Sequence, residues 1–150
     1  MPQSLSKVLL HVVFSTKNRE QTIPEHLRNK LHAYLAGICR ERGSEAYRVG
    51  GTSNHVHVAC SLSRTLSLSK LVEEMKKPSS KWMKQQEGGR TDFSWQAGYG
   101  IFSLGQSQLP ALIQYIENQE EHHRNKSFKE ELGEFLKKYG VDYDERYLWD

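Results

Sequence analysis

The sequence has few cysteines, few prolines and no long hydrophobic run. Only 2 of its 150 residues are cysteines and 4 are prolines. Cys39 and Cys60 are too few for a disulfide framework, and we interpret both as reduced thiols of a cytosolic protein. The apolar run at residues 8–14 is too short to span a membrane and has no signal cleavage site. We therefore expect one cytoplasmic domain without a membrane anchor.

Charge is distributed unevenly along the chain. Residues 1–116 contain 15 Lys and Arg against 8 Asp and Glu, whereas residues 117–150 contain 6 against 10. The formal net charge of +3 hides this division into a basic body and an acidic tail. A basic body is compatible with a polyanionic partner such as nucleic acid, although many basic domains bind none.

The order of hydrophobic patterns predicts the fold. Alternating segments predict strands near residues 8–14, 46–49, 55–60 and 93–103, and helical spacing predicts helices near 24–42 and 66–83, the second bent at Pro78. Gly50-Gly51 with Ser53-Asn54 is expected to form a hairpin turn. The order β-α-β-β-α-β is that of the α+β ferredoxin-like fold, in which two helices cover one face of a four-stranded antiparallel sheet. Further helices are expected near residues 107–124 and 128–139.

The segment from Asn54 to Cys60 alternates strictly between two faces. His55, His57 and Ala59 share one face, and Cys60 points to the other. Ala59 stands where a histidine-triad hydrolase needs its third histidine, and the chain lacks the second His-x-Ser/Thr unit of a two-histidine phosphoesterase. The pair is therefore either two-thirds of a metal site, completed elsewhere in the chain, or two hydrogen-bonded histidines without a ligand.

A stripe of polar residues on the helix near residues 107–124 offers the missing groups. Tyr115, Gln119 and His122 follow one another at i, i+4 and i+7, apart from the apolar stripe of that helix. A tyrosine in such a place is usually a packing residue, and a glutamine is usually solvated. Beside the histidine pair they indicate a cation held by two imidazoles and an amide oxygen, with a nucleophilic phenol one turn away.

Basic residues concentrate between residues 76 and 90. This segment is either a solvated helix face anchored by Trp82 or one wall of a groove for nucleic-acid phosphates. The candidate phosphate-binding residues are Lys17, Arg19, Lys76, Lys77, Lys81, Lys84 and Arg90.

Four motifs together resemble the single-tyrosine HUH transposases, a family that includes the small IS200-like insertion-sequence transposases and the REP-associated tyrosine transposases. The motifs are Val12-Val13-Phe14-Ser15-Thr16-Lys17, His55-Val56-His57, Trp95-Gln96-Ala97-Gly98-Tyr99-Gly100, and Tyr115-Ile116-Glu117-Asn118-Gln119 followed by His122-His123. The resemblance covers residues 5–125 and does not extend beyond residue 128.

The resemblance implies a DNA transposase. His55, His57 and Gln119 would bind Mg²⁺ or Mn²⁺, with His122 and His123 behind them. Tyr115 would attack the scissile phosphate of single-stranded DNA, giving a 5′-phosphotyrosine and a free 3′-hydroxyl. Ligand chemistry alone favours Mn²⁺ or Zn²⁺ over Mg²⁺, because imidazole is a softer donor than Mg²⁺ prefers.

The resemblance also implies the partners. DNA hairpins would be recognised by a homodimer in which the helix with Tyr115 and Gln119 crosses to complete the neighbour's site. Residues 1–127 would form the catalytic domain, and residues 128–150 a helical, acidic tail of unknown role. Two alternatives stay open: a non-catalytic nucleic-acid-binding ferredoxin-like module, and a domesticated transposase that serves its host. A strand face of His, His and Ala favours metal binding over base stacking.

Overall fold

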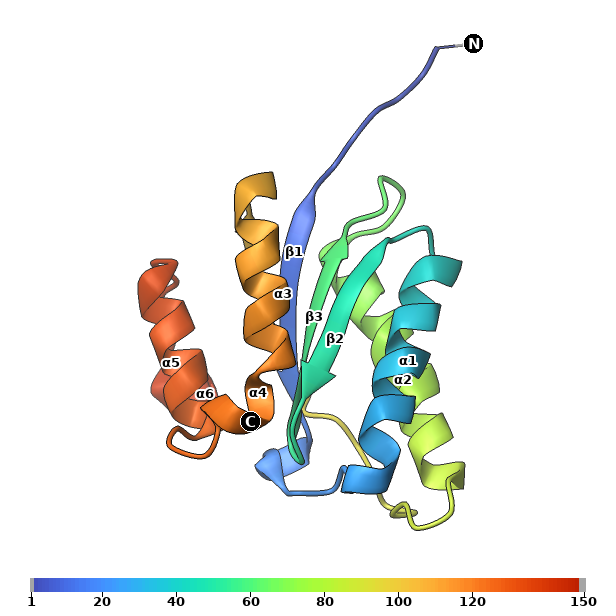
Figure 1. The fold of residues 1–150 in the computed structure, drawn as a ribbon, viewed down its shortest axis with the longest axis vertical. Coiled ribbons are helices and arrows are strands. Elements are labelled where there is room, and N and C mark those ends of the chain that lie inside the picture. The colour runs from blue at the N-terminus through green and yellow to red at the C-terminus, as the bar shows by residue number, and fades with distance from the viewer. Residues whose placement is uncertain (1, 149–150) are drawn as a thin grey trace.

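The computed structural model describes residues 2–148 and contains one four-stranded sheet (Figure 1). The strands are β1 (Leu9–Ser15), β2 (Ala46–Gly51), β3 (His55–Ser61) and β4 (Gly100–Leu104). They lie in the order β2-β3-β1-β4, and all neighbours are antiparallel. This topology confirms the expected ferredoxin-like fold and places β3, the strand of the histidine pair, inside the sheet.

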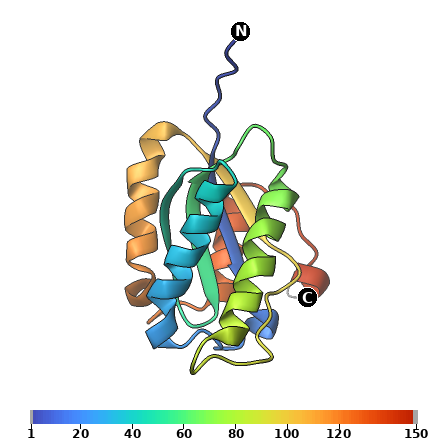
Figure 2. The same ribbon diagram turned by 90° about the vertical axis from the view of Figure 1, so that its right-hand side faces the viewer.

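Helices cover both faces of the sheet. The long helices are α1 (Glu25–Glu41), α2 (Leu68–Gln85), α3 (Leu109–Glu117) and α5 (Phe128–Lys138). The short ones are η1 (Lys17–Arg19), η2 (Gln106–Gln108), α4 (Gln119–His122) and α6 (Glu145–Leu148). Figure 1 shows α1 and α2 on one side and α3 and α5 on the other, and Figure 2 views the sheet from the α1 and α2 side. No helix among the described residues is long and apolar enough to cross a membrane.

The main core lies between the sheet and the pair α1 and α2. Val56, Val58 and Cys60 of β3 point into it. On the opposite face the hydrophobic packing is divided into two smaller clusters. One contains Leu9, Ala59, Leu109 and Ile116, and the other contains Val13, Phe102, Phe128 and Leu136. The polar site described below lies on the face where these two clusters pack.

Helix α2 runs without interruption through Pro78, the position at which the sequence predicts a bend. A proline inside a helix removes one backbone hydrogen bond and crowds the preceding turn. Here Ser79 Oγ donates an additional hydrogen bond to the Met75 carbonyl at 2.5 Å. Met75 and Met83 are both fully buried, so core packing on either side of Pro78 holds the helix together.

The last strand is shorter than expected. It begins at Gly100, and the backbone of residues 93–99 pairs with the rest of the sheet through an isolated bridge between Thr16 and Trp95. The Nζ of Lys76 donates to the carbonyls of residues 96, 97 and 98 at 2.6, 3.3 and 2.8 Å. These carbonyls therefore bind an ammonium group in place of a neighbouring strand.

The limits of one strand and one helix also differ from the sequence prediction. Gly50 and Gly51 belong to β2, so the hairpin turn consists of residues 52–54. The helix expected near residues 107–124 is divided at Asn118 into α3 and α4. The expected tail includes α6, while Trp149 and Asp150 lie outside the described residues.

Candidate metal and tyrosine site

The histidine pair is buried beneath α3 and α5. His55 and His57 are each 0% exposed, and they share the sheet face with Ala59 as the alternation predicts. This face is not open to solvent, because two helices cover it. Any ligand of these imidazoles must therefore come from the covering helices or enter between them.

Helices α3 and α4 bring the predicted tyrosine and glutamine to the pair. Gln119 Oε1 lies 2.9 Å from His55 Nε2, and the rings of Tyr115 and His57 have centroids 5.8 Å apart. Gly50 permits this approach, because a Cβ there would lie 2.7 Å from Ile116 Cγ2. The four residues predicted from the sequence thus meet within one chain.

Glu131 on α5 lies at the centre of this group, and the sequence reasoning missed it. Its Oε1 atom lies 2.9 Å from His57 Nε2, 3.1 Å from His123 Nε2 and 3.6 Å from His55 Nε2. Its Oε2 atom accepts hydrogen bonds from the Tyr115 hydroxyl and, at 3.1 Å, from the Gln119 amide. Only 1% of Glu131 is exposed.

A signal for Glu131 exists in the sequence. It stands in an otherwise apolar helical stripe formed by Phe128, Leu132 and Phe135. A carboxylate on the buried side of a helix is costly unless it is paired, so it indicates partners nearby. The resemblance ended before this helix and therefore gave no reason to look there.

His11 on β1 is a second residue that the sequence reasoning did not assign. Its Nε2 lies 2.7 Å from His57 Nδ1. The other imidazole of the pair is held in the same way, since His55 Nδ1 lies 2.8 Å from Asn54 Oδ1. Both imidazoles are thus held through Nδ1 and present Nε2 to the site, which is the usual way in which a protein orients metal-binding histidines.

Burial sets the protonation of this cluster. Burial, together with the neighbouring His57, lowers the pKa of His55 and of His11 to about 3 in each case. Burial, the hydrogen bond to Glu131 and the charge of Glu131 raise the pKa of Tyr115. Burial opposes ionisation of Glu131, but the adjacent His123 and His57 imidazoles hold the pKa of its carboxyl far below the usual value. Near pH 7, His55 and His11 are therefore neutral, Glu131 is charged and the phenol is protonated.

The donor atoms fit a metal ion. One ligand atom from each of His55, His57, His123 and Glu131 lies within 4.8 Å of the other three. Ligands of a tetrahedral ion with bonds of about 2.1 Å are roughly 3.4 Å apart. His123 Nε2 is buried without a hydrogen bond of acceptable geometry, although it lies close to Glu131 Oε1. Neutral imidazoles with one carboxylate suit first-row divalent metals.

The candidate phosphate-binding residues are divided between two regions. Helix α2, with Lys76, Lys77, Lys81 and Lys84, covers the sheet face opposite the histidine pair. Lys76 is half-buried, which lowers its pKa to about 8, and its ammonium binds the backbone carbonyls described above. We therefore propose no phosphate contact for Lys76. Lys77 pairs with Glu73 at 2.7 Å.

The other region lies near the site. Arg90 pairs with Asp92 at 2.7 Å at the surface. The turn η1 carries Lys17 and Arg19 and contacts Asn54, whose side-chain amide donates to the Arg19 carbonyl at 3.3 Å. Because Asn54 also contacts His55, this turn places Lys17 and Arg19 closer to the histidine pair than α2 places its lysines.

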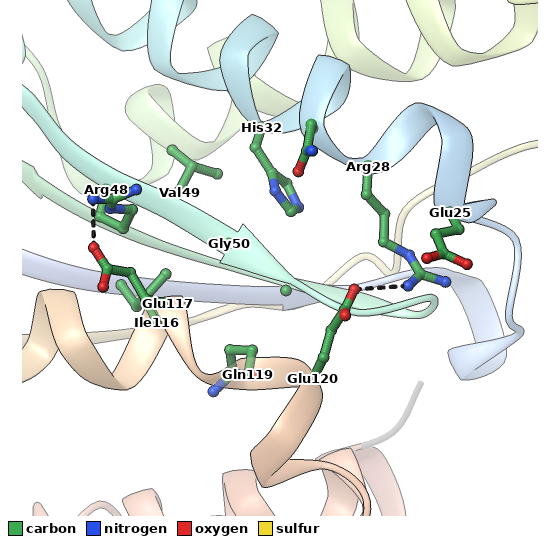
Figure 3. Close-up of a pocket in the computed structure, with 12 residues that line it drawn as sticks. Glu25, Arg28, His32, Arg48, Val49, Gly50, Ile116, Glu117, Gln119 and Glu120 are labelled. Carbon is green, nitrogen blue, oxygen red and sulfur yellow. Dashed lines mark hydrogen bonds and ion pairs between the residues drawn. The ribbon is translucent and has the colours of Figure 1, made fainter.

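A pocket of about 400 Å³ lies beside the site, between α1, β2 and the segment from α3 to α4 (Figure 3). Gln119 forms part of its wall. Its two arginines are engaged, since Arg28 pairs with Glu120 at 3.0 Å and Arg48 pairs with Glu117 at 2.5 Å. The pocket therefore offers little free positive charge to an anion.

Comparison with protein families identifies the class to which this site belongs. The sequence model of the family described as Transposase IS200 like matches residues 4–119, well over half of the chain. The chain belongs to this family. A comparison with curated proteins gave no match.

Two solved structures share the fold. One is a protein of Deinococcus radiodurans R1 assigned as a transposase, with a TM-score of 0.59 and 21% identity over 79% of this chain and 98% of that one. The other is a REP-associated tyrosine transposase bound to a REP hairpin, with a TM-score of 0.59 and 16% identity over 82% of this chain and 73% of that one. Together with the family match, they identify a transposase of the IS200 and REP tyrosine type.

Proposed function

We propose that this transposase cleaves and rejoins single-stranded DNA through Tyr115, with a divalent metal held by His55, His57 and Gln119. One observation carries the proposal. Helix α3 brings the Tyr115 ring beside His57, and α4, which follows it after Asn118, brings the Gln119 amide to His55. A nucleophile one turn from a metal-binding amide is the arrangement that this reaction requires.

The metal, Mg²⁺ or Mn²⁺, would polarise a non-bridging oxygen of the scissile phosphate and orient the strand. The chain's own residues supply the rest. The Tyr115 oxygen attacks phosphorus, the bond from phosphorus to the 3′-oxygen breaks, and the departing 3′-oxygen takes up a proton. The products are a 5′-phosphotyrosine and a free 3′-hydroxyl. Attack by another 3′-hydroxyl reverses the step and rejoins strands without an external energy source.

Tyr115 needs a proton acceptor, because its raised pKa keeps the phenol protonated. His122 Nε2 lies 3.2 Å from the Tyr115 hydroxyl and is carried by α4, directly after α3. We assign it as the acceptor once the hydroxyl no longer donates to Glu131. Proton transfer to a positioned imidazole is a common way to activate such a nucleophile.

The substrate is proposed from the structural likeness. The REP-associated relative was solved with a REP hairpin, and we propose a hairpin flanked by single-stranded DNA for this chain. We also propose that residues 1–127 carry catalysis and that the protein forms a homodimer. Within the single chain, α3 packs on its own β2 and β3, so Tyr115 meets the His57 of the same chain. The expected crossing of this helix to a partner remains a prediction.

A non-catalytic nucleic-acid-binding module is less compatible with the fold. RNA-binding sheets of this topology stack bases on exposed aromatic residues of their central strands. Here α3 and α5 cover that face, and β1 and β3 are almost completely buried. The covered face holds polar groups that converge on one point, which supports catalysis.

The test is a search for covalent protein–DNA complexes. The protein is incubated with a library of single-stranded hairpin oligonucleotides and Mn²⁺, and the products are separated on a denaturing gel. We expect a band that resists denaturation and carries labelled DNA. The absence of such a band with every hairpin, in protein that binds at least one of them, would contradict the proposal.

A further inference from the structure

Two potential metal ligands lie beyond the part of the chain that the family model matches. That match ends at residue 119, whereas His123 and Glu131 follow it. Both direct their donor atoms to the same point as the histidine pair, and the Nε2 atoms of all three histidines lie within 3.6 Å of Glu131 Oε1. The described chain thus holds a donor set larger than the one proposed for catalysis.

This larger set leaves less room for a substrate. His55, His57, His123 and Glu131 supply four donors, which would fill a tetrahedral ion and four of the six positions of an octahedral ion such as Mn²⁺. Catalytic metal sites normally keep positions open for water or substrate. A scissile phosphate would therefore compete with these ligands for a metal in this site.

Burial leads to the same conclusion. His55 and His57 are 0% exposed and Glu131 is 1% exposed. Phe128, at the start of α5, stacks on His55 with ring centroids 4.6 Å apart. A phosphate has no direct path to the imidazoles while α5 is in place.

Glu131 is the ligand best placed to withdraw. His55 and His57 are fixed in an inner strand, and His123 directly follows α4. Helix α5 is a separate element after residues 123–127, and it packs on the sheet through a small hydrophobic cluster of its own. Its movement would expose the site without unpairing a strand.

The contacts of Glu131 are those that an incoming phosphate needs. Its carboxylate accepts hydrogen bonds from the Tyr115 hydroxyl and the Gln119 amide. The Glu131 carboxylate therefore occupies the position that the scissile phosphate must take. While the Gln119 amide nitrogen donates to Glu131, the carboxylate fixes the orientation of the Gln119 side chain. Withdrawal of Glu131 would leave Gln119 free to turn its Oε1 atom toward the metal.

We propose that His123 and Glu131 bind the metal together with His55 and His57 in the DNA-free protein, and that the scissile phosphate displaces Glu131. This inference rests on the proposed function. It adds that α5 controls both the affinity for metal and the entry of DNA.

The first test measures Mn²⁺ binding without DNA, by titration calorimetry, in the Tyr115→Phe background. Glu131→Gln keeps the shape of the side chain and removes the charged donor, and we expect it to weaken Mn²⁺ binding at least tenfold, as should His123→Asn. Glu130→Gln is the matched control, because it makes the same change on an exposed neighbour in α5, and it should leave the affinity unchanged. Unchanged affinity in Glu131→Gln would exclude Glu131 as a ligand. This test requires no cleavage, so it is independent of the proposed reaction.

The second test separates displacement from a direct role in catalysis. At saturating Mn²⁺, Glu131→Gln with intact Tyr115 should form the covalent complex several-fold faster than the wild type, because the phosphate no longer competes with a carboxylate. A slower reaction would show that Glu131 takes part in the chemistry and would overturn displacement. Gln119→Ala should slow the reaction while changing DNA-free Mn²⁺ affinity less than Glu131→Gln does.

Folding is checked by circular dichroism for each variant. If Glu131→Gln does not fold, Glu131→Asp replaces it. The shorter side chain keeps the charge and withdraws the oxygen by one carbon–carbon bond, so Mn²⁺ affinity should again fall. Wild-type affinity in a folded Glu131→Asp protein would overturn the assignment.

Discussion

The Nε2 atom of His57 lies 2.9 Å from Oε1 of Glu131, across 74 positions of sequence. His57 belongs to an inner strand and Glu131 to a helix near the end of the chain. The contact is buried and forms part of a network that includes the tyrosine hydroxyl. Helix α5, which lies outside residues 1–127, therefore contributes a side chain to this buried cluster.

Replacement of Tyr115 by Phe should abolish the covalent protein–DNA complex and leave hairpin binding intact. The change removes the nucleophilic oxygen and one hydrogen bond to the charged Glu131, a loss of about 1.5–3 kcal/mol of stability. Gel electrophoresis measures the complex, and a filter-binding titration measures affinity. Tyr99→Phe is the control, since Tyr99 is 45% exposed and lies in another motif. Wild-type cleavage by Tyr115→Phe would exclude this residue as the nucleophile.

Removal of the metal should stop cleavage reversibly. EDTA should abolish formation of the covalent complex, and added Mn²⁺ should restore it. His57→Ala should lose most of the activity at every Mn²⁺ concentration, whereas Gln119→Ala should be milder because water can replace a neutral amide ligand. Cleavage that persists in EDTA would contradict the metal role even if Tyr115 proves to be the nucleophile.

The metal-free protein should lose stability as the pH falls below about 6.5. The pKa of His11 and that of His55 are each lowered to about 3 in the folded state, so at intermediate pH the unfolded chain binds more protons. The free energy of unfolding then decreases with falling pH, down to about pH 3. Urea unfolding in EDTA at a series of pH values measures this dependence.

A pair of histidine variants tests the assignment of this pH dependence. His11→Asn should flatten it, whereas His26→Asn, at an exposed site, should not. A urea midpoint that stays constant between pH 7 and pH 4 would show that the buried imidazoles are not linked to folding.

Lys17 should contact the strand near the scissile phosphate. Lys17→Ala should make the plot of log binding constant against log salt concentration less steep by about 0.7, which is the contribution of one phosphate on a single strand. The effect should be the same for a short unpaired strand and for a complete hairpin, because η1 lies beside the histidine end of β3.

The lysines of α2 provide the comparison for Lys17. Lys81 and Lys84 are exposed on the opposite face of the sheet, so they can reach only DNA that extends around the molecule. Their double alanine variant should change the slope for the complete hairpin and not for the short strand. An unchanged slope with both DNAs would indicate that this part of α2 is a solvated helix face.

A mixed-chain experiment decides whether the helix with Tyr115 and Gln119 crosses to a partner. In the single chain Tyr115 meets its own His57, whereas the family resemblance implies exchange of α3. If the helix crosses, a mixture of Tyr115→Phe and His57→Ala proteins, each inactive alone, should regain activity under conditions that allow subunits to exchange. Verified heterodimers that stay inactive would exclude the exchange. Each chain alone is the control.

The sequence by itself determined the sheet and the faces of its strands. Strict alternation put His55 and His57 on one face, because successive side chains of a strand point in opposite directions. Helical spacing likewise put Tyr115 and Gln119 on one stripe. These relationships are local, since each depends only on the geometry of one element.

Tertiary structure decided what those elements meet. Glu131 and His123 join the histidine pair only because α5 and α4 pack on that sheet face, and no local period encodes such packing. Lys76 looked like a surface cation, but the path of residues 96–98 gave its ammonium three carbonyl partners. Pro78 remains helical because buried neighbours on both sides outweigh its local preference. In each case the contacts between distant segments contribute more free energy than the local conformational preference of the sequence.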